Sequence, residues 1–150
     1  MISVQEMMTA KPFTLSQYDS LNDARKLMEE KRIRHIPIVD EEKLVGLITE
    51  RDILAQGISK QRSVSSEELT NIESGILLAD IMTTHVISVH SNLAIANAAH
   101  LIYTKKIGCL PVINYKNKLL GIITDHDFVA ITIQLLDVMA EEEPLDDGFA

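Results

Sequence analysis

The sequence has 150 residues and is 46% hydrophobic, with 14 Lys and Arg against 22 Asp and Glu, which gives a formal net charge of -8. This excess of negative charge argues against a general binder of nucleic acid or of anionic membranes. The length suffices for one sizeable core, whereas half of it would be marginal alone, so we predict one compact domain.

The lone cysteine and the absence of a long apolar stretch in the sequence indicate the compartment. Cys109 has no second cysteine with which to form an internal disulfide, which fits a reducing environment. No apolar stretch approaches the roughly 18 residues needed to cross a bilayer, and the N-terminus lacks a signal-like run. We therefore expect a soluble, cytoplasmic protein.

Residues 1–57 are predicted to form a first unit of strands and helices. A stripe of apolar residues recurs at helical spacing between Leu21 and Met28, and Asp19 or Ser20 can cap the start of that helix. A strand, this helix, two strands and a second helix are expected at residues 13–16, 20–31, 35–39, 44–49 and 50–56.

Residues 58–76 are predicted to link this unit to the next. Serine and charged residues up to position 66 indicate an exposed loop. Ser65 and Glu68 then have the spacing of a capping box, and Leu69, Ile72 and Ile76 follow at helical spacing, which predicts a short linker helix.

Residues 77–140 repeat the pattern of the first unit, and residues 141–150 form an acidic tail that we expect to be flexible and solvated. The same order of elements is expected at residues 86–89, 94–105, 109–113, 118–124 and 125–140. Seven identities align at an offset of 74, from Met8 with Met82 to Pro37 with Pro111, and six more at 75. Two such copies are predicted to bury their apolar faces against each other and to leave a functional cleft between them.

The strongest local motif ends each unit: G-x-x-T-x-x-D at 46–52 and again at 121–127. Each copy places a hydroxyl, a carboxylate and free backbone N–H groups at the start of a helix. Such an end can hold a phosphate while the carboxylate accepts hydrogen bonds from a sugar diol. The alternative is a simple N-cap without ligand. The occurrence of the motif in both units favours a functional site.

A second motif precedes it: R-H-I-P at 34–37 and G-C-L-P at 108–111. Proline at a strand start cannot donate a ladder hydrogen bond, so backbone groups nearby could read an adenine ring. Arg34 and Arg51 could neutralise phosphate in the first unit, unless they only form solvated surface. In the second unit the nearby cations are His126, Lys105 and Lys106.

With these motifs in this order, the chain resembles a tandem pair of CBS domains, the Bateman module named after cystathionine beta-synthase. The resemblance covers about residues 2–140 and rests on the Met-Thr pairs at 8–9 and 82–83, the alanine of each central helix, and the two motifs above. It implies a mixed α+β or α/β fold of two pseudo-symmetric β-α-β-β-α units packed through their sheets. Two clefts in that fold commonly bind AMP, ADP or ATP, and sometimes S-adenosylmethionine or a dinucleotide.

The resemblance also implies roles for individual residues. It assigns ribose hydroxyls to Asp52 and Asp127, and hydroxyl or phosphate contacts to Thr49 and Thr124. The residues that would frame adenine are Thr14 and Ser88, with the backbone near Ile36, Pro37, Leu110 and Pro111.

The phosphate-binding positions differ between the two units. Arg34 and Arg51 fit them in the first unit, whereas the second has Gly108 and His126 there. The second cleft could therefore prefer a less charged ligand, take phosphate contacts from across the interface, or stay empty.

We therefore hypothesise a non-catalytic sensor that binds an adenosine nucleotide and signals through a change in shape or assembly. The resemblance implies a homodimer, and the signal would pass to a separate effector protein. The alternative is a module for dimerisation or docking whose clefts have no ligand. An enzyme would need Cys109 with His35 or His126 as its base, although a packed cysteine is the expected state. The five histidines lack metal-ligand spacing, so no metal site is expected.

Overall fold

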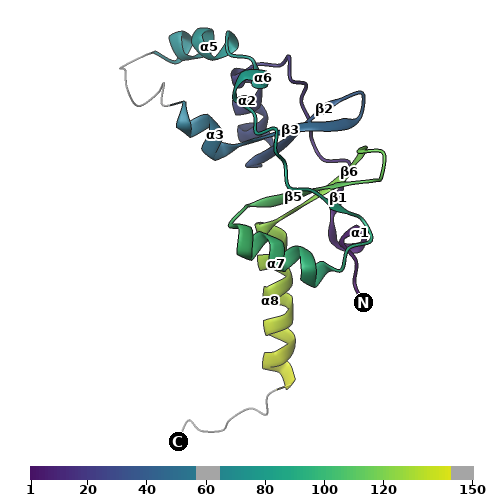
Figure 1. Cartoon of the computed structure of the whole chain (residues 1–150). Coiled ribbons are helices and arrows are strands. Elements are labelled where there is room, and N and C mark those ends of the chain that lie inside the picture. The colour runs from purple at the N-terminus through teal and green to yellow at the C-terminus, as the bar shows by residue number, and fades with distance from the viewer. Residues whose placement is uncertain (57–64, 143–150) are drawn as a thin grey trace, which may run out of the picture.

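The computed structural model describes residues 1–56 and 65–142 of the chain. Two β-sheets lie next to each other in the middle of the molecule, with helices on their outer sides (Figure 1). The elements in chain order are α1 (Val4–Met7), β1 (Thr9–Ala10), α2 (Leu21–Lys31), β2 (His35–Asp40), β3 (Lys43–Thr49), α3 (Glu50–Ala55), α5 (Ser66–Ser74), α6 (Leu78–Ile81), β4 (Val89–His90), α7 (Ile95–Lys105), β5 (Cys109–Ile113), β6 (Leu119–Thr124) and α8 (Asp125–Glu142).

Each unit contributes one antiparallel hairpin, β2-β3 in the first and β5-β6 in the second. The register of both hairpins shifts at equivalent positions, between Ile38 and Val39 and between Val112 and Ile113. The second hairpin belongs to a four-stranded sheet of order β1-β6-β5-β4, whereas β2-β3 forms a two-stranded sheet. The repeat in the sequence thus extends to the irregularities of the strand pairing.

The first segment of each unit packs against the other unit in space. Val4 of α1 donates its N–H to the carbonyl oxygen of Leu93 at 2.8 Å, and the equivalent Leu78 of α6 donates to Asp19 at 2.9 Å. Thr9 of β1 continues this exchange by pairing with β6 of the second unit. The two units are therefore interlocked, and each completes its core with a residue from the start of the other.

Each unit has its own hydrophobic core. The first core is formed by Leu21, Ala24, Met28, Ile36, Ile38, Ile48, Ile53 and Leu78. The second is formed by Val4, Val89, Ala98, Leu110, Val112 and Ile123. The apolar stripe predicted for residues 20–31 is confirmed, since Leu21 and Ala24 are fully buried and Met28 is nearly so. Burial of such side chains contributes about 1.5–3 kcal/mol each.

The linker helix α5 is attached to α2 by one ion pair. Its start is capped by Ser65, whose hydroxyl oxygen accepts from the N–H of Glu68 at 3.2 Å, but the return bond from Ser65 N–H to the Glu68 side chain, which a complete capping box would have, is not formed. Near its end Glu73 is only 1% exposed and accepts hydrogen bonds from Nε of Arg25 at 2.9 and 3.0 Å and from its terminal nitrogen at 2.6 Å. The buried carboxylate is thereby fully paired, as burial of a charge requires.

One predicted strand is absent from the structure. The strand expected at residues 13–16 is wrong, because this segment pairs with the two-stranded sheet at one residue alone, through a bridge between Leu15 and Ile38. In the second unit the equivalent strand is confined to β4. The other helices and strands agree within two residues. The loop at 57–64 and the tail from 143 lie outside the described residues.

Candidate functional site

A threonine and an aspartate close the first turn of the helix that follows each hairpin. The N–H of Thr49 donates to Oδ2 of Asp52 at 2.8 Å, and the N–H of Asp52 donates to Oγ1 of Thr49 at 3.2 Å. The pair Thr124 and Asp127 repeats this arrangement at 2.8 and 3.4 Å. These reciprocal contacts are those of capping boxes, so the N-cap that the sequence left open as an alternative exists in both units.

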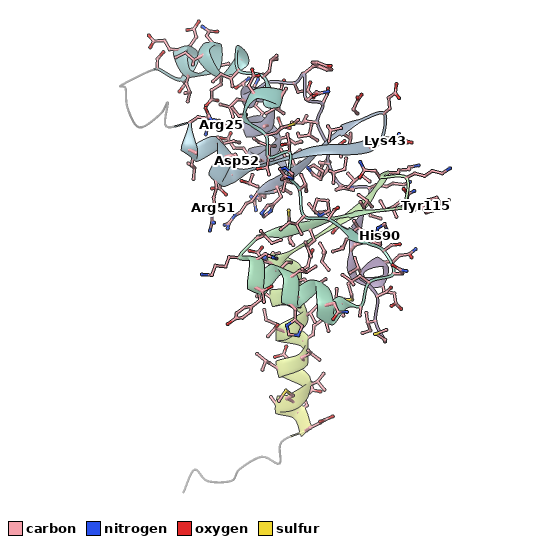
Figure 2. All side chains as sticks on the ribbon, viewed as in Figure 1. Arg25, Lys43, Arg51, Asp52, His90 and Tyr115 are labelled. Atoms are coloured by element: carbon pink, nitrogen blue, oxygen red, sulfur yellow. The ribbon has the colours of Figure 1, made fainter. Side chains whose placement is uncertain are left out.

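One cleft, which we call cleft 1, opens between the end of the first hairpin and the second unit. Its volume is about 620 Å³, and residues of both units line it. The first unit provides Arg34, His35, Leu47, Thr49, Glu50, Arg51 and Leu54, and the second side is formed by Thr83, His85, Val86, Ile87, Lys106, Ile107, Gly108, Cys109 and Asp125. In Figure 2, Arg51 extends from α3 on the side that faces the second unit.

A second cleft of about 590 Å³, cleft 2, is built in the equivalent way at the other hairpin. Thr9 and Phe13 line cleft 2 at the positions that Thr83 and Ile87 hold in cleft 1. The remaining lining residues are Pro12, Arg32, Ile33, Arg34, His35, Ile122, Thr124, Asp125, His126, Asp127 and Val129. The internal repeat thus produces two related clefts, each with walls from both halves of the chain.

The basic residues of the two clefts come partly from the opposite unit. Arg51 lines cleft 1 and its counterpart His126 lines cleft 2. Across from them lie Lys106 in cleft 1 and Arg32 in cleft 2, which occupy equivalent positions directly after α7 and α2. The second cleft therefore takes cations from across the interface, which was one of the three alternatives that the sequence left open.

The role of Arg32 was not predicted, and Lys106 lies in the cleft opposite to the one expected. Both residues end a helix with a left-handed backbone, at φ 54 and 55. The sequence shows that a basic residue recurs at this offset. It does not show which cleft the residue lines, because that depends on how the two units pack.

His35 lies between the two clefts and lines both of them. Its imidazole lies against Gly108, where an added Cβ would be 2.5 Å from Nε2. Burial lowers the pKa of His35 below its ordinary value, although the nearby carboxylate of Asp125 opposes this effect. The neutral imidazole is therefore favoured at this position.

Cys109 is buried on the floor of cleft 1. Burial, with a further contribution from Asp125, raises the pKa of its thiol to about 12. The thiolate, which is the nucleophilic form, is thus disfavoured near neutral pH. This environment is unsuited to the nucleophile that an enzymatic role for Cys109 would need.

The clefts bring together only some of the predicted site residues. Arg34, Thr49 and Arg51 line cleft 1, and Arg34, Thr124, His126 and Asp127 line cleft 2. Asp52 is half-buried beside Thr49 and does not itself line cleft 1. The predicted adenine contacts are not among the lining residues: the side chains of Ile36, Pro37, Leu110 and Pro111 are fully buried, which leaves their backbone for a ligand, and Thr14 and Ser88 belong to neither lining.

Within residues 1–56 and 65–142, no group of three or more His, Cys, Asp or Glu side chains could hold a metal ion. No helix there is long and apolar enough to cross a membrane.

The family model for the CBS domain matches twice, at residues 4–58 and 78–132. The chain belongs to the CBS domain family. Its two units are CBS units, as the resemblance in the sequence predicted, and the α+β fold of two such repeats is confirmed.

Curated relatives include short and long CBS proteins. The CBS domain-containing protein YhcV of Bacillus subtilis is 30% identical over 131 residues, which cover 85% of this chain and 83% of YhcV. The uncharacterized protein MJ1225 of Methanocaldococcus jannaschii is 31% identical over 91% of this chain and 50% of that protein. A homoserine O-acetyltransferase of Methanococcoides burtonii is 34% identical over 83% of this chain, but the match spans 23% of the enzyme.

Solved CBS structures match over nearly the whole chain. A Vibrio cholerae protein named for acetoin utilization (AcuB) is 42% identical with a TM-score of 0.76, over 96% of this chain and 99% of that one. CBSX2, solved in complex with AMP, has 27% identity and a TM-score of 0.75, over 90% and 98%. The CBS pair of MJ0100, in complex with 5'-methylthioadenosine and S-adenosyl-L-methionine, has 27% identity and a TM-score of 0.74, over 90% and 98%.

Proposed function

We propose that this CBS pair is a non-catalytic regulatory module that binds an adenosine nucleotide, such as AMP, ADP or ATP, in the clefts between its units. The observation that carries the proposal is the pair of equivalent clefts, each lined by a threonine of the G-x-x-T-x-x-D motif and by basic residues from both units. The complexes of CBSX2 with AMP and of MJ0100 with adenosine derivatives support this ligand class. S-adenosylmethionine is a further ligand to test.

The roles of the site residues are part of this proposal. Each capping box occupies Oδ2 of its aspartate, and among the described residues no donor bonds Oδ1 of Asp52 or Asp127, so that oxygen can accept from ribose. Thr49 and Thr124 would contact hydroxyl or phosphate groups, and Arg34, Arg51 and His126 would bind phosphate. Adenine would lie near Thr14 and the backbone of Ile36 and Pro37, or near Ser88, Leu110 and Pro111 in the other unit.

Calorimetric titration with AMP, ADP, ATP and S-adenosylmethionine tests the proposal. We expect micromolar binding of at least one of them, and a stoichiometry that counts the working clefts. Asp52→Ala and Asp127→Ala should each weaken binding in one cleft. Ser65→Ala is the matched control, since it also removes a capping hydrogen bond at a helix start but lies outside both clefts. If neither aspartate variant loses affinity, the ribose assignment is wrong.

The output of binding would be a change in shape or in assembly. A ligand that contacts both units shifts their arrangement only by the difference in its affinity for the alternatives. The helix α8 extends away from the sheets (Figure 1) and exposes apolar side chains, among them Val129 (55%), Ile133 (53%) and Leu136 (56%). An apolar helix of this kind is normally covered, which supports a homodimer.

Light scattering before and after addition of nucleotide tests the assembly. A mass of two chains that falls to one in Leu136→Lys would support dimerisation through α8, and a monomer at all concentrations would contradict it. The signal would then pass to a separate effector protein. The lone cysteine supports the cytoplasm as the compartment.

The second candidate is a dimerisation or interaction module without ligand. Two observations favour it: both capping boxes are complete without a bound molecule, and α8 offers an exposed apolar surface. Failure of all four compounds to bind, together with a stable dimer, would select this candidate over the sensor.

A further inference from the structure

Three residues line both clefts, Arg34, His35 and Asp125, and Arg34 is the one with a guanidinium. It is the last residue before β2, and its side chain is 79% exposed. Its one ion pair among the described residues is with Glu50, at 3.4 Å from Nε to Oε2, and the side chain of Glu50 is 52% exposed. An exposed pair of this kind contributes little, so the guanidinium can leave Glu50 for an anionic ligand in either cleft at small cost.

The repeat would allow two cations at this place, but the chain has one. The position equivalent to Arg34 in the second unit is Gly108, and the imidazole of His35 lies directly over it. A Cβ on Gly108 would be 2.5 Å from Nε2 and 3.0 Å from Cε1 of that ring. A side chain here would displace His35, so the packing leaves Arg34 alone between the clefts.

The fixed charges of the two clefts are unequal. Cleft 1 has Arg34, Arg51 and Lys106 against the carboxylates of Glu50 and Asp125. Cleft 2 has Arg32 and Arg34 against Asp125 and Asp127. When Arg34 turns to a phosphate in cleft 1, cleft 2 is left with one arginine and two carboxylates. A second phosphate there then meets a net negative surrounding, which disfavours it.

Given the proposed function, on which this inference rests, we propose that Arg34 couples the two clefts: a phosphate-bearing ligand in one cleft takes the arginine and weakens phosphate binding in the other. The clefts are therefore negatively cooperative for anionic ligands. By linkage the effect is reciprocal, and couplings of this kind amount to about 5- to 150-fold in affinity.

Variants of the two equivalent residues that each line a single cleft separate this coupling from simple asymmetry. Arg51 lines only cleft 1, so Arg51→Glu should repel AMP from that cleft and leave Arg34 for cleft 2. Calorimetry should then show one AMP, bound about tenfold more tightly than the second AMP of the wild-type protein. Adding Arg34→Gln should abolish that gain. The mirror variant His126→Glu should remove the weaker AMP and leave the tighter one unchanged.

Each outcome decides between the two proposals. If the AMP retained by Arg51→Glu has the affinity of the second AMP of the wild-type protein, the clefts are independent. The proposed coupling is then wrong, and the proposed function as a nucleotide sensor is unaffected. If the wild-type protein binds one AMP, transfer of that AMP to cleft 2 in Arg51→Glu supports coupling, and its loss contradicts it. If the wild-type protein binds no AMP, ADP or ATP, the proposed function itself fails.

Discussion

The side chain of Met82 lies against Gly46, and a Cβ added to that glycine would be 2.5 Å from the Met82 sulfur. The equivalent contact joins Met8 and Gly121, also at 2.5 Å. Each methionine lies near the start of one CBS unit and fills the space that the glycine leaves in the last strand of the other. These contacts explain why a methionine and a glycine both recur in the repeat, since the methionine side chain occupies the space where a side chain on the glycine would lie.

Substitution of the two glycines should have unequal cost. An alanine at Gly46 meets only the flexible side chain of Met82, whereas one at Gly121 also meets the backbone oxygen of Thr9, at 2.8 Å. Overpacking costs about 1–3 kcal/mol, so we expect about 1 kcal/mol for Gly46→Ala and about 3 kcal/mol for Gly121→Ala. Urea unfolding measures both. In double-mutant cycles Met82→Ala should remove most of the cost of Gly46→Ala, and equal costs for the two glycines would contradict the prediction.

Loss of Arg25 should destabilise the protein more than loss of its partner. Arg25→Ala leaves the carboxylate of Glu73 buried and unpaired, whereas Glu73→Ala leaves an arginine whose side chain is already 28% exposed. Breaking a buried pair costs about 3–5 kcal/mol, so we expect about 3 kcal/mol for Arg25→Ala and less for Glu73→Ala. Thermal unfolding checks the order. The prediction fails if Glu73→Ala is the more destabilising variant.

The motif aspartates should stabilise the protein even without nucleotide. Asp52→Ala removes the acceptor for the N–H of Thr49, which now bonds it at 2.8 Å. Loss of such a cap costs about 1 kcal/mol, and Asp127→Ala should behave alike. Unfolding in the absence of nucleotide gives this contribution, and the difference in melting temperature with and without nucleotide gives the part that belongs to binding. Unchanged stability of both variants would show that the capping boxes contribute nothing.

The buried imidazole of His35 should make stability depend on pH. Its pKa is lowered in the folded protein by burial, so the unfolded chain binds more protons between that value and the ordinary pKa of about 6.5. The contribution of neutral His35 to the free energy of unfolding should therefore be fully present above about pH 6.5 and decrease as the pH falls through this window. Urea unfolding across the window, for the wild-type protein and His35→Gln, measures the effect. If the free energy of unfolding of His35→Gln changes with pH as in the wild-type protein, the pH dependence comes from other groups.

The thiol of Cys109 should be inert in the folded protein. Because burial raises its pKa to about 12, little thiolate exists at pH 8, and iodoacetamide should react far more slowly than with the chain in denaturant. Mass spectrometry after timed exposure measures both rates. Rapid alkylation of the folded protein would instead restore Cys109 as a candidate nucleophile.

Much of the local structure followed from the sequence alone. The spacing of Thr49 and Asp52 predicted a capped helix start, the stripe from Leu21 to Met28 predicted a buried helix face, and Ser65 with Glu68 predicted the start of α5. These features depend on residues within one helix of each other. The repeat then predicted a cleft between the two copies, and the resemblance to CBS domains implied that there are two.

Only the tertiary structure decided which parts of the chain meet. Periodicity tells that a segment has an apolar face and does not name its partner, so it could not show that Val4 completes the second core and Leu78 the first. The same holds for Arg34: the sequence assigned it to the first unit, and the packing of the two units placed it between both clefts. Contacts between distant segments depend on how two folded surfaces fit together, which local spacing does not encode.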